Sequence, residues 1–168
     1  MRVAEEITVR AAAPADAAAI RDVAVAAWWA TYRGRLADDT IARFLAQAYS
    51  TERIEVRIDR HEVLVAGTAG TSGGAVDAFA EVVERDDHVQ LVAIYTRPLS
   101  RGRGLGSALL GGVVAAHPGD DVAADVLLDN DLAEPFYAAR GFVPGESLID
   151  EIAGDPVLER RWWLRAEP

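Results

Sequence analysis

The sequence predicts a mixed α/β domain, in which helices flank a central β-sheet. Three observations lead to this prediction. The apolar residues follow a helical period up to about residue 60, a strand period begins near residue 62, and strand and helix patterns then alternate to the C-terminus. The chain has 168 residues, 51% hydrophobic and 26% charged, so we expect one domain over residues 1–168.

The N-terminal part is predicted to hold one strand and at least two helices. Ile7 to Ala11 alternates as a short strand does. Pro14 and Asp16 suit the first turn of a helix, whose apolar stripe is Ile20, Val23, Ala24, Ala27 and Trp28. Asp38 or Asp39 can cap a second helix, with the stripe Ile41, Phe44, Leu45, Ala48 and Tyr49. The charged stretch that follows, up to Arg60, is either helical or irregular.

Strand patterns dominate the middle of the chain. Residues 62–66 and 75–84 flank GTAGTSGG (67–74), a turn signal that predicts a hairpin. Residues 89–96 are apolar at nearly every position, as in a central strand that is covered on both faces. The next helix has the stripe Leu105, Ala108, Leu109, Gly112, Val113 and Ala116, and Pro118 with Gly119 ends it.

The C-terminal part is predicted to hold three strands and a short helix. Residues 122–128 form a strand pattern, and Asp129 to Asp131 can cap a helix that runs to Arg140. Gly141 suits the C-terminal end of that helix. Residues 142–149 and 157–164 are predicted as closing strands that pair with each other.

Composition excludes several classes of protein. All 17 basic residues are arginines, so the lysine of a Walker A loop or of a pyridoxal Schiff base is missing, and the absence of cysteine excludes thiolate nucleophiles and disulfides. The net charge of -10 argues against nucleic acid or an anionic membrane as the partner, while cationic partners remain allowed. Charges interrupt every apolar stretch of the first twenty residues, and no stretch approaches about 20 apolar residues, so we expect a cytoplasmic protein.

Glycine and arginine alternate between a predicted strand and a predicted helix, in RPLSRGRGLG (97–106). At a helix N-terminus the backbone NH groups and the helix dipole favour an anion, and glycine lets the backbone approach it. Arg101 and Arg103 add positive charge where a pyrophosphate would lie. The alternative is that Gly104 and Gly106 only permit a tight turn. The spacing does not match the Rossmann fingerprint, because Ser107 stands at the place of its last glycine.

Two stretches of the chain resemble the GNAT superfamily of N-acetyltransferases. RPLSRGRGLGSALL (97–110) resembles the family's motif A, whose arginine and two glycines correspond to Arg101, Gly104 and Gly106. NDLAEPFYAARGF (130–142) is similar to a second family stretch, at the expected distance downstream. The resemblance covers nearly the whole chain. It implies a GNAT-like acyl-CoA N-acyltransferase fold with a mixed, mostly antiparallel central sheet of about six or seven strands, flanked by helices.

The resemblance also implies a site for acetyl-CoA. Its pyrophosphate would lie on the glycine turn, formed by Arg101, Gly102, Arg103, Gly104, Leu105, Gly106 and Ser107. Its pantetheine would run beside Ile94, Tyr95 and Thr96, and one NH of that strand would stabilise the thioester oxyanion. Asn130 would bond the pantetheine, with Ala133 and Phe136 lining the groove. The hydroxyl of Tyr137 would protonate the departing thiolate.

The chain departs from the family pattern at two places. Pro135 lies late for a helix that starts at residue 131, so the helix either starts nearer Ala133 or kinks, and Asn130 then need not align with Tyr137. Gln90 stands where many relatives carry a glutamate that takes the proton of the incoming amine. Glu81 and His88 are the candidate substitutes, with a chain of waters as a third alternative.

The acceptor site is expected in the N-terminal helices, at AWWATYRGRLADD (27–39). Trp28, Trp29, Tyr32 and Arg33 could line it; alternatively, one tryptophan belongs to the core and the other to a dimer contact. The acidic chain favours a cationic amine on a small molecule or a peptide as acceptor. A homodimer is one option for the assembly, and the scattered histidines at 61, 88 and 117 imply no metal site.

The resulting hypothesis is an N-acetyltransferase that moves the acetyl group of acetyl-CoA to a primary amine by direct attack in a ternary complex. The absence of cysteine agrees with a route that has no covalent enzyme intermediate. The alternative is a non-catalytic acyl-CoA-binding sensor or scaffold module with the same fold.

Overall fold

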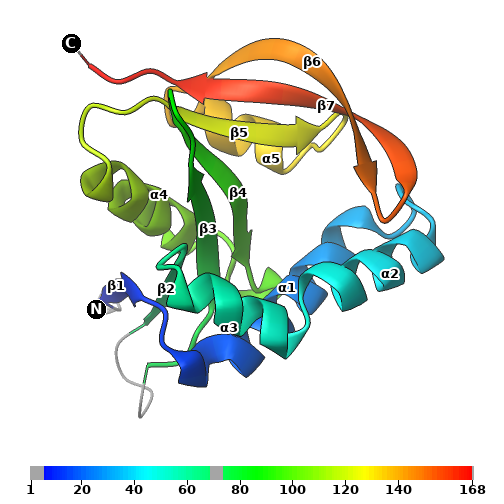
Figure 1. Ribbon diagram of the computed structural model, residues 1–168, viewed down its shortest axis with the longest axis horizontal. Helices are drawn as coiled ribbons and strands as arrows, with labels where there is room; N and C mark the ends of the chain where they lie inside the picture. Colours follow the sequence, from blue (N-terminus) through cyan, green and yellow to red (C-terminus); the bar gives the residue numbers. More distant parts are fainter. Residues whose placement is uncertain (1–5, 69–73, 168) are drawn as a thin grey trace.

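The computed structural model describes residues 6–68 and 74–167, and within them seven strands form one mixed β-sheet (Figure 1). The strands follow the spatial order β1-β2-β3-β4-β5-β7-β6; β4 and β5 are parallel, and the other neighbours are antiparallel. Their bounds are β1 Ile7–Ala11, β2 Val63–Thr68, β3 Ala78–Glu84, β4 Val89–Thr96, β5 Val122–Leu127, β6 Val143–Ile152 and β7 Asp155–Leu164. The predicted mixed, mostly antiparallel sheet is confirmed.

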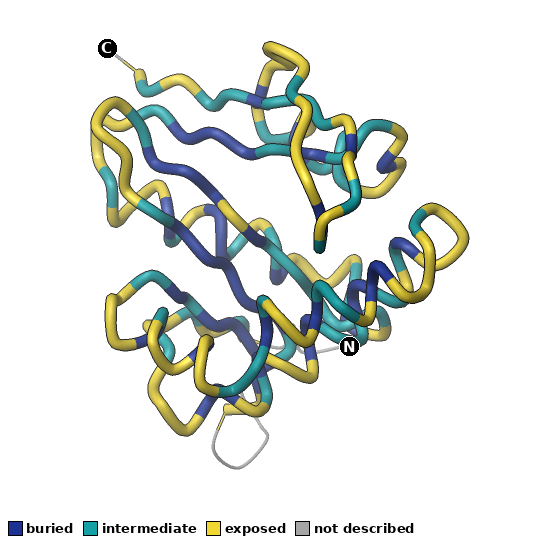
Figure 2. Tube along the Cα trace, turned by 45° about the vertical axis from the view of Figure 1, so that its right-hand side comes forward, coloured by how far each residue is buried: buried dark blue, intermediate teal, exposed yellow. Residues whose placement is uncertain are grey.

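Helices cover both faces of this sheet and bury one apolar cluster on each side. One cluster joins the sheet to three helices, α1 Ala17–Tyr32, α2 Asp38–Ala48 and α3 Thr51–Asp59. The other joins it to α4 Leu105–Ala116 and α5 Ala133–Ala138. Short 3-10 turns, Pro14–Asp16 and Pro98–Ser100, precede α1 and follow β4. Buried stretches run along the central strands, with exposed segments around the outside (Figure 2). No helix in the described ranges is long and apolar enough to cross a membrane.

The charged stretch before Arg60, which the sequence left as helical or irregular, is the helix α3, and the hydroxyl oxygen of Ser50 caps it by accepting a hydrogen bond from the Arg53 amide at 3.4 Å. The bounds of other elements differ from the sequence prediction. The closing strands are longer than predicted, because Ala153 and Gly154 both take positive φ and join β6 to β7 in a tight hairpin. The second strand of the predicted hairpin starts at Ala78, and most of its turn, residues 69–73, lies outside the described residues.

The parallel strands β4 and β5 separate halfway along their length. Their pairing ends at Leu91 and Ala124. On its other side β4 carries a bulge, because Val82 of β3 pairs with Leu91 whereas Glu81 pairs with Ala93, which leaves Val92 as the extra residue. A bulge bends its strand and disrupts the ladder locally. Residues 92–96 of β4 therefore border an opening between β4 and β5.

The β6–β7 hairpin closes the far side of this opening by reaching α2 (Figure 1). Ile152 and Val157, near its tip, are buried in the same cluster as α1 and α2. Asp155 of the tip accepts a hydrogen bond from the Thr40 hydroxyl and pairs with Arg43 at 3.0 Å. One end of the hairpin is thus fixed to α2, and the inner face of β7 is turned toward α1.

Candidate functional site

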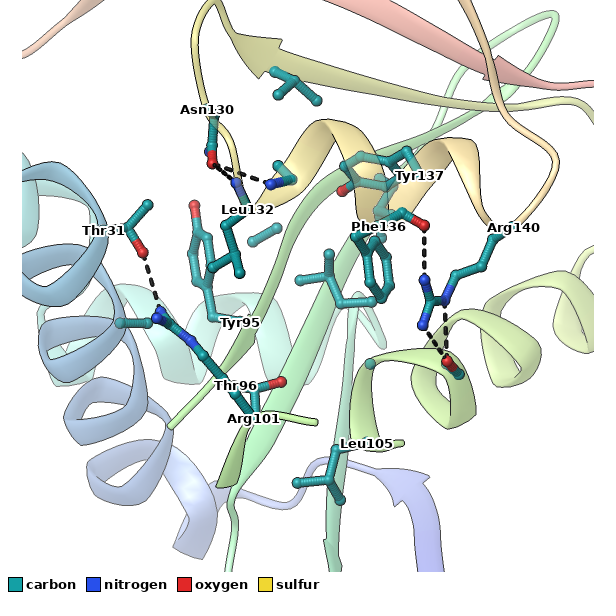
Figure 3. A pocket seen from close by; sticks show the side chains of 18 of the residues that line it. Thr31, Tyr95, Thr96, Arg101, Leu105, Asn130, Leu132, Phe136, Tyr137 and Arg140 are labelled. Carbon is teal, nitrogen blue, oxygen red and sulfur yellow. Dashed lines mark hydrogen bonds between the residues drawn. The ribbon is translucent and has the colours of Figure 1, made fainter. Parts of the chain in front are cut away.

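A cavity of about 380 Å³ occupies the opening between β4 and β5 (Figure 3). Its walls come from both strands, from α1, from α5 and from the turn between β4 and α4. Nearly every residue that the resemblance assigned to acetyl-CoA lines it: Ile94, Tyr95, Thr96, Arg101, Gly102, Gly104, Leu105, Gly106, Ser107, Asn130, Ala133, Phe136 and Tyr137. Arg103, in the same turn, is not among the lining residues.

The glycine turn presents the N-terminal end of α4 to the cavity. Gly104 precedes the helix with φ +88°, a left-handed conformation that strains any residue with a side chain. Among the described residues, the amide nitrogens of residues 104–107 donate no hydrogen bond, and the first helical bond runs from the Ala108 amide to the Gly104 carbonyl at 3.0 Å. Arg101 donates to the Thr31 hydroxyl at 3.0 Å, which ties the turn to α1. Unbonded amides at a helix N-terminus are a suitable site for phosphate.

Replacing Gly104 with alanine should lower the free energy of unfolding by about 1–2 kcal/mol, because the left-handed backbone must then carry a Cβ. Gly111→Ala is the matched control. A Cβ at Gly111 meets nothing within 4 Å, and alanine inside a helix is favoured by about 0.5–1 kcal/mol. Urea unfolding of both variants checks the prediction, which is wrong if Gly104→Ala is as stable as the wild type.

Helices α4 and α5 meet closely at the cavity wall. A Cβ at Gly106 would lie 2.9 Å from the ring of Phe136, so a side chain there would force that ring to move. Arg140 stacks over the same ring, 3.7 Å from its centroid, and donates to the Ser107 hydroxyl at 2.6 Å. Gly106 therefore permits this close contact, and Arg140, two residues beyond the end of α5, joins that segment to Ser107 of α4.

Asn130 precedes α5, whose N-cap residue is Leu132, and its side chain bonds the amides at the start of the helix. Its side-chain oxygen accepts hydrogen bonds from the Leu132 amide at 3.2 Å and the Ala133 amide at 3.1 Å, and its nitrogen donates to the Tyr32 hydroxyl at 3.2 Å. The helix starts at Ala133, so Pro135 falls in the first turn, where proline is tolerated. Of the two alternatives that Pro135 left open, the structure shows the later start, so Asn130 and Tyr137 do not lie on one helical face, although both residues line the cavity.

Tyr137 directs its hydroxyl into the cavity (Figure 3). Its ring packs against the rings of Phe136 and Phe142, with centroids 5.2 and 5.0 Å away. No hydrogen bond joins its hydroxyl to another described residue. Burial raises the pKa of Tyr137, so the phenol is protonated at neutral pH. The cavity thus contains a proton donor that has no hydrogen-bond partner in the described part of the chain.

The structure does not bring Glu81 or His88 to the cavity. Glu81 is buried on β3 and pairs with Arg57 of α3 at 2.6 Å; burial raises its pKa and Arg57 opposes that rise. His88 lies at the start of β4, between the carboxylate of Asp87 at 2.6 Å and the side-chain oxygen of Gln90 at 3.2 Å. The alternating pattern around Glu81 could not show from the sequence which face of the sheet its side chain lies on. Neither residue lies at the cavity, where a base for the acceptor amine is expected.

Of the predicted acceptor residues, Tyr32 lines the cavity. Trp28 is a core residue, stacked on Phe44 with centroids 4.0 Å apart, as the alternative interpretation proposed for one of the tryptophans. Trp29 is half-buried and lies beneath the exposed Arg33, whose guanidinium is 4.8 Å from its ring centroid. Neither Trp29 nor Arg33 is among the lining residues. Burial raises the pKa of Tyr32 to about 12.

Besides Arg140, the cavity wall contains a second charged residue that was not predicted from the sequence, Asp125. It lies on β5 opposite Arg161 of β7, which donates to both of its oxygens, at 2.7 and 2.9 Å. The side-chain nitrogen of Gln90 donates to it as well, at 3.1 Å. An acidic residue inside an otherwise apolar strand was the available signal. Gln90 is therefore a donor that helps to hold a carboxylate at the cavity wall.

Comparison with known proteins agrees with this geometry. The family model described as "Acetyltransferase (GNAT) family" matches residues 22–142. A search of curated proteins gives no match. Among solved structures, PaiA N-acetyltransferase from Thermoplasma acidophilum in complex with coenzyme A has a TM-score of 0.76 at 21% identity, over 92% of this chain and 98% of that one.

Two further structures show the same fold. A GCN5-related N-acetyltransferase (aminotransferase, class II) from Rhodopseudomonas palustris has a TM-score of 0.77 at 21% identity, over 99% of both chains. Ard1 from Thermoplasma volcanium has a TM-score of 0.70 at 18% identity, over 96% of this chain and 99% of that one. The family model spans most of the chain, and the fold and the glycine turn agree with it. The chain belongs to the acetyltransferase (GNAT) family.

Proposed function

We propose that this acetyltransferase moves the acetyl group of acetyl-CoA to a primary amine by direct attack within a ternary complex. The observation that carries the proposal is the placement of two features on one cavity. The amides of residues 104–107, which donate to no residue in the described ranges, lie at one part of its wall, and the hydroxyl of Tyr137 lies at another. The coenzyme A in the PaiA structure supports acetyl-CoA as the donor.

The residues fit acetyl-CoA as co-substrate. Gly104 and Gly106 have no side chain between the helix N-terminus and the cavity, so the amides of the turn can bind a pyrophosphate. Residues 92–96 of β4 have no partner in β5, which leaves backbone groups for an extended pantetheine. An NH of this segment can stabilise the oxyanion that forms when the thioester is attacked. Asn130 contributes by fixing α5, because it already bonds Tyr32, Leu132 and Ala133.

Tyr137 is proposed as the group that protonates the thiolate of departing CoA. A phenol with a raised pKa holds its proton at neutral pH, and it can give that proton to a thiolate within hydrogen-bond distance. The acceptor is proposed to be an amine on a small molecule or a peptide, attracted as a cation by the acidic chain and by Asp125 at the cavity wall. The cytoplasmic location and the homodimer remain predictions.

Two measurements test the proposal in order. Saturating acetyl-CoA, at about a hundred times its Kd, should stabilise the protein by about 2.7 kcal/mol and raise Tm by roughly 5–10 °C, whereas pyrophosphate at the same concentration should raise it less. Release of CoA thiol is then measured with polyamines, aminoglycosides, amino acids and peptide N-termini. Equal shifts with both ligands would contradict acetyl-CoA binding. Binding without acetylation of any amine would favour the sensor or scaffold module.

A further inference from the structure

Glu159 lies beside the cavity, on the face of β7 that is turned toward α1. It is two residues from Val157, which is buried against α1 and α2, and two residues from Arg161, which holds Asp125. Residues two apart in a strand share a face. Its backbone partner in β5 is Leu127, two residues beyond Asp125. Glu159 therefore stands next to Asp125 on the face of the sheet that packs against α1.

The carboxylate of Glu159 is half-buried and has no hydrogen bond or ion pair with any described residue. The charged groups that act on it are Asp125 of β5, Asp150 of β6 and Arg161 of its own strand, and its charge in turn acts on the Tyr32 hydroxyl of α1. Burial, followed by the repulsion of Asp150 and Asp125, raises the pKa of Glu159 to about 7. The attraction of Arg161 is the smaller effect.

The two neighbouring carboxylates differ in their partners. Three donor groups hold the side chain of Asp125, two from Arg161 and one from Gln90. Among the described residues no donor bonds the side chain of Glu159, and its burial, followed by the repulsion of Asp150 and Asp125, favours its protonated form. A carboxylate held in place by donors suits the binding of a cation, whereas one without donors suits the role of a proton acceptor.

We propose that Glu159 takes the proton that the acceptor ammonium must lose before it attacks the thioester, and that Asp125 holds this ammonium as a fixed negative charge. The inference rests on the proposed acetyl transfer. Glu159 is not among the residues that line the cavity, whereas Asp125 and Tyr32 beside it are, so the proton travels the last step through water between them. Glu159 thereby replaces the carboxylate that Gln90 does not supply.

The proton balance of the reaction is complete with these groups. The ammonium gives one proton to the Glu159 carboxylate and becomes an amine, whose electron pair forms the C–N bond as the C–S bond breaks. The thiolate that leaves takes a proton from the Tyr137 hydroxyl. The new amide nitrogen then loses its second proton, which restores that hydroxyl. Glu159 finally releases its proton to solvent, so one proton is produced for each acetyl group transferred.

The test is the pH profile of kcat/KM for Glu159→Gln, with Glu151→Gln as the matched control on the exposed part of the same hairpin. In the wild type and in the control, kcat/KM should rise with pH to a plateau above about pH 7. In Glu159→Gln it should be about 10²-fold lower at pH 7 and should keep rising about tenfold per pH unit until the amine itself has lost its proton. The KM for acetyl-CoA should not change.

Asp125→Asn separates the two carboxylates. In this variant kcat/KM should still rise with pH to a plateau, and the rising part, the limb of the profile, should lie at lower pH, because a negative charge near Glu159 has been removed. If the limb vanishes in Asp125→Asn and persists in Glu159→Gln, Asp125 is the proton acceptor and the inference is wrong. A profile of Glu159→Gln that is parallel to that of the control also overturns it.

A stability measurement examines Glu159 without any activity. A carboxylate whose folded-state pKa is raised contributes stability that is present at low pH and is lost as pH rises through about 7. Glu159→Gln should therefore melt at a higher temperature than Glu151→Gln at pH 8, with the difference vanishing near pH 4.5. Equal melting temperatures at both pH values overturn the inference even in an active enzyme. If these shifts are found but no amine is acetylated, the proposed function has failed, and the role of Glu159 falls with it.

Discussion

Replacing Tyr137 with phenylalanine should lower kcat for acetyl transfer by about 10²-fold or more, while the affinity for acetyl-CoA stays near that of the wild type. The substitution removes one oxygen, which bonds no described residue. The ring keeps its packing against Phe136 and Phe142, so α5 and the cavity wall should keep their shape. Steady-state kinetics, together with calorimetric titration of acetyl-CoA, separates the chemical step from binding.

Tyr49→Phe is the control for this experiment, because Tyr49 is also a buried tyrosine but does not line the cavity. It should leave kcat near the wild-type value. If Tyr137→Phe retains full kcat, water or another group protonates the thiolate. If its affinity for acetyl-CoA falls in step with kcat, the hydroxyl acts in binding, and the proposed role in the chemistry is wrong.

The parts of the site that the sequence predicted are those encoded locally. The glycine turn could be recognised because strand, turn and helix follow one another along the chain, and Gly104 and Gly106 stand where the structure needs a left-handed residue and a close contact. Tyr137 could be found for the same reason, seven residues after Asn130 in one short stretch. In both cases the residues that are close together in the sequence are also close together in the structure.

The acidic side of the cavity could not be predicted, because it depends on pairing between distant strands. Asp125 meets Arg161 through the register of β5 and β7, which are 36 residues apart at this pair. Gln90 reaches Asp125 only because β4 lies beside β5. A one-residue change of register would turn these side chains to the opposite face, and no local pattern fixes that register. Glu159 was missed for the same reason.

Glu81 was a candidate base in the sequence, and in the structure it is a buried carboxylate that pairs with Arg57 away from the cavity. It is 5% exposed, and its partner Arg57 also donates to the Ala48 carbonyl and stacks over Tyr49, 5.0 Å from the ring centroid. The pair thus joins β3 to the end of α2 and to α3. Removing one member of a buried ion pair leaves a charge without compensation, which usually costs about 3–5 kcal/mol, whereas replacing both by apolar side chains is often neutral.

Arg57→Met should therefore lower the free energy of unfolding by about 3–5 kcal/mol and Tm by roughly 6–20 °C, whereas Arg57→Met combined with Glu81→Leu should recover most of the loss. Burial already raises the pKa of Glu81, and Arg57 is the group that opposes this rise. Because the stability linked to a raised pKa is lost as pH rises, the deficit of Arg57→Met should be larger at pH 8 than at pH 5. Urea unfolding at both pH values measures it. A deficit independent of pH, or a double variant as unstable as the single one, would show that the buried charge is not its cause.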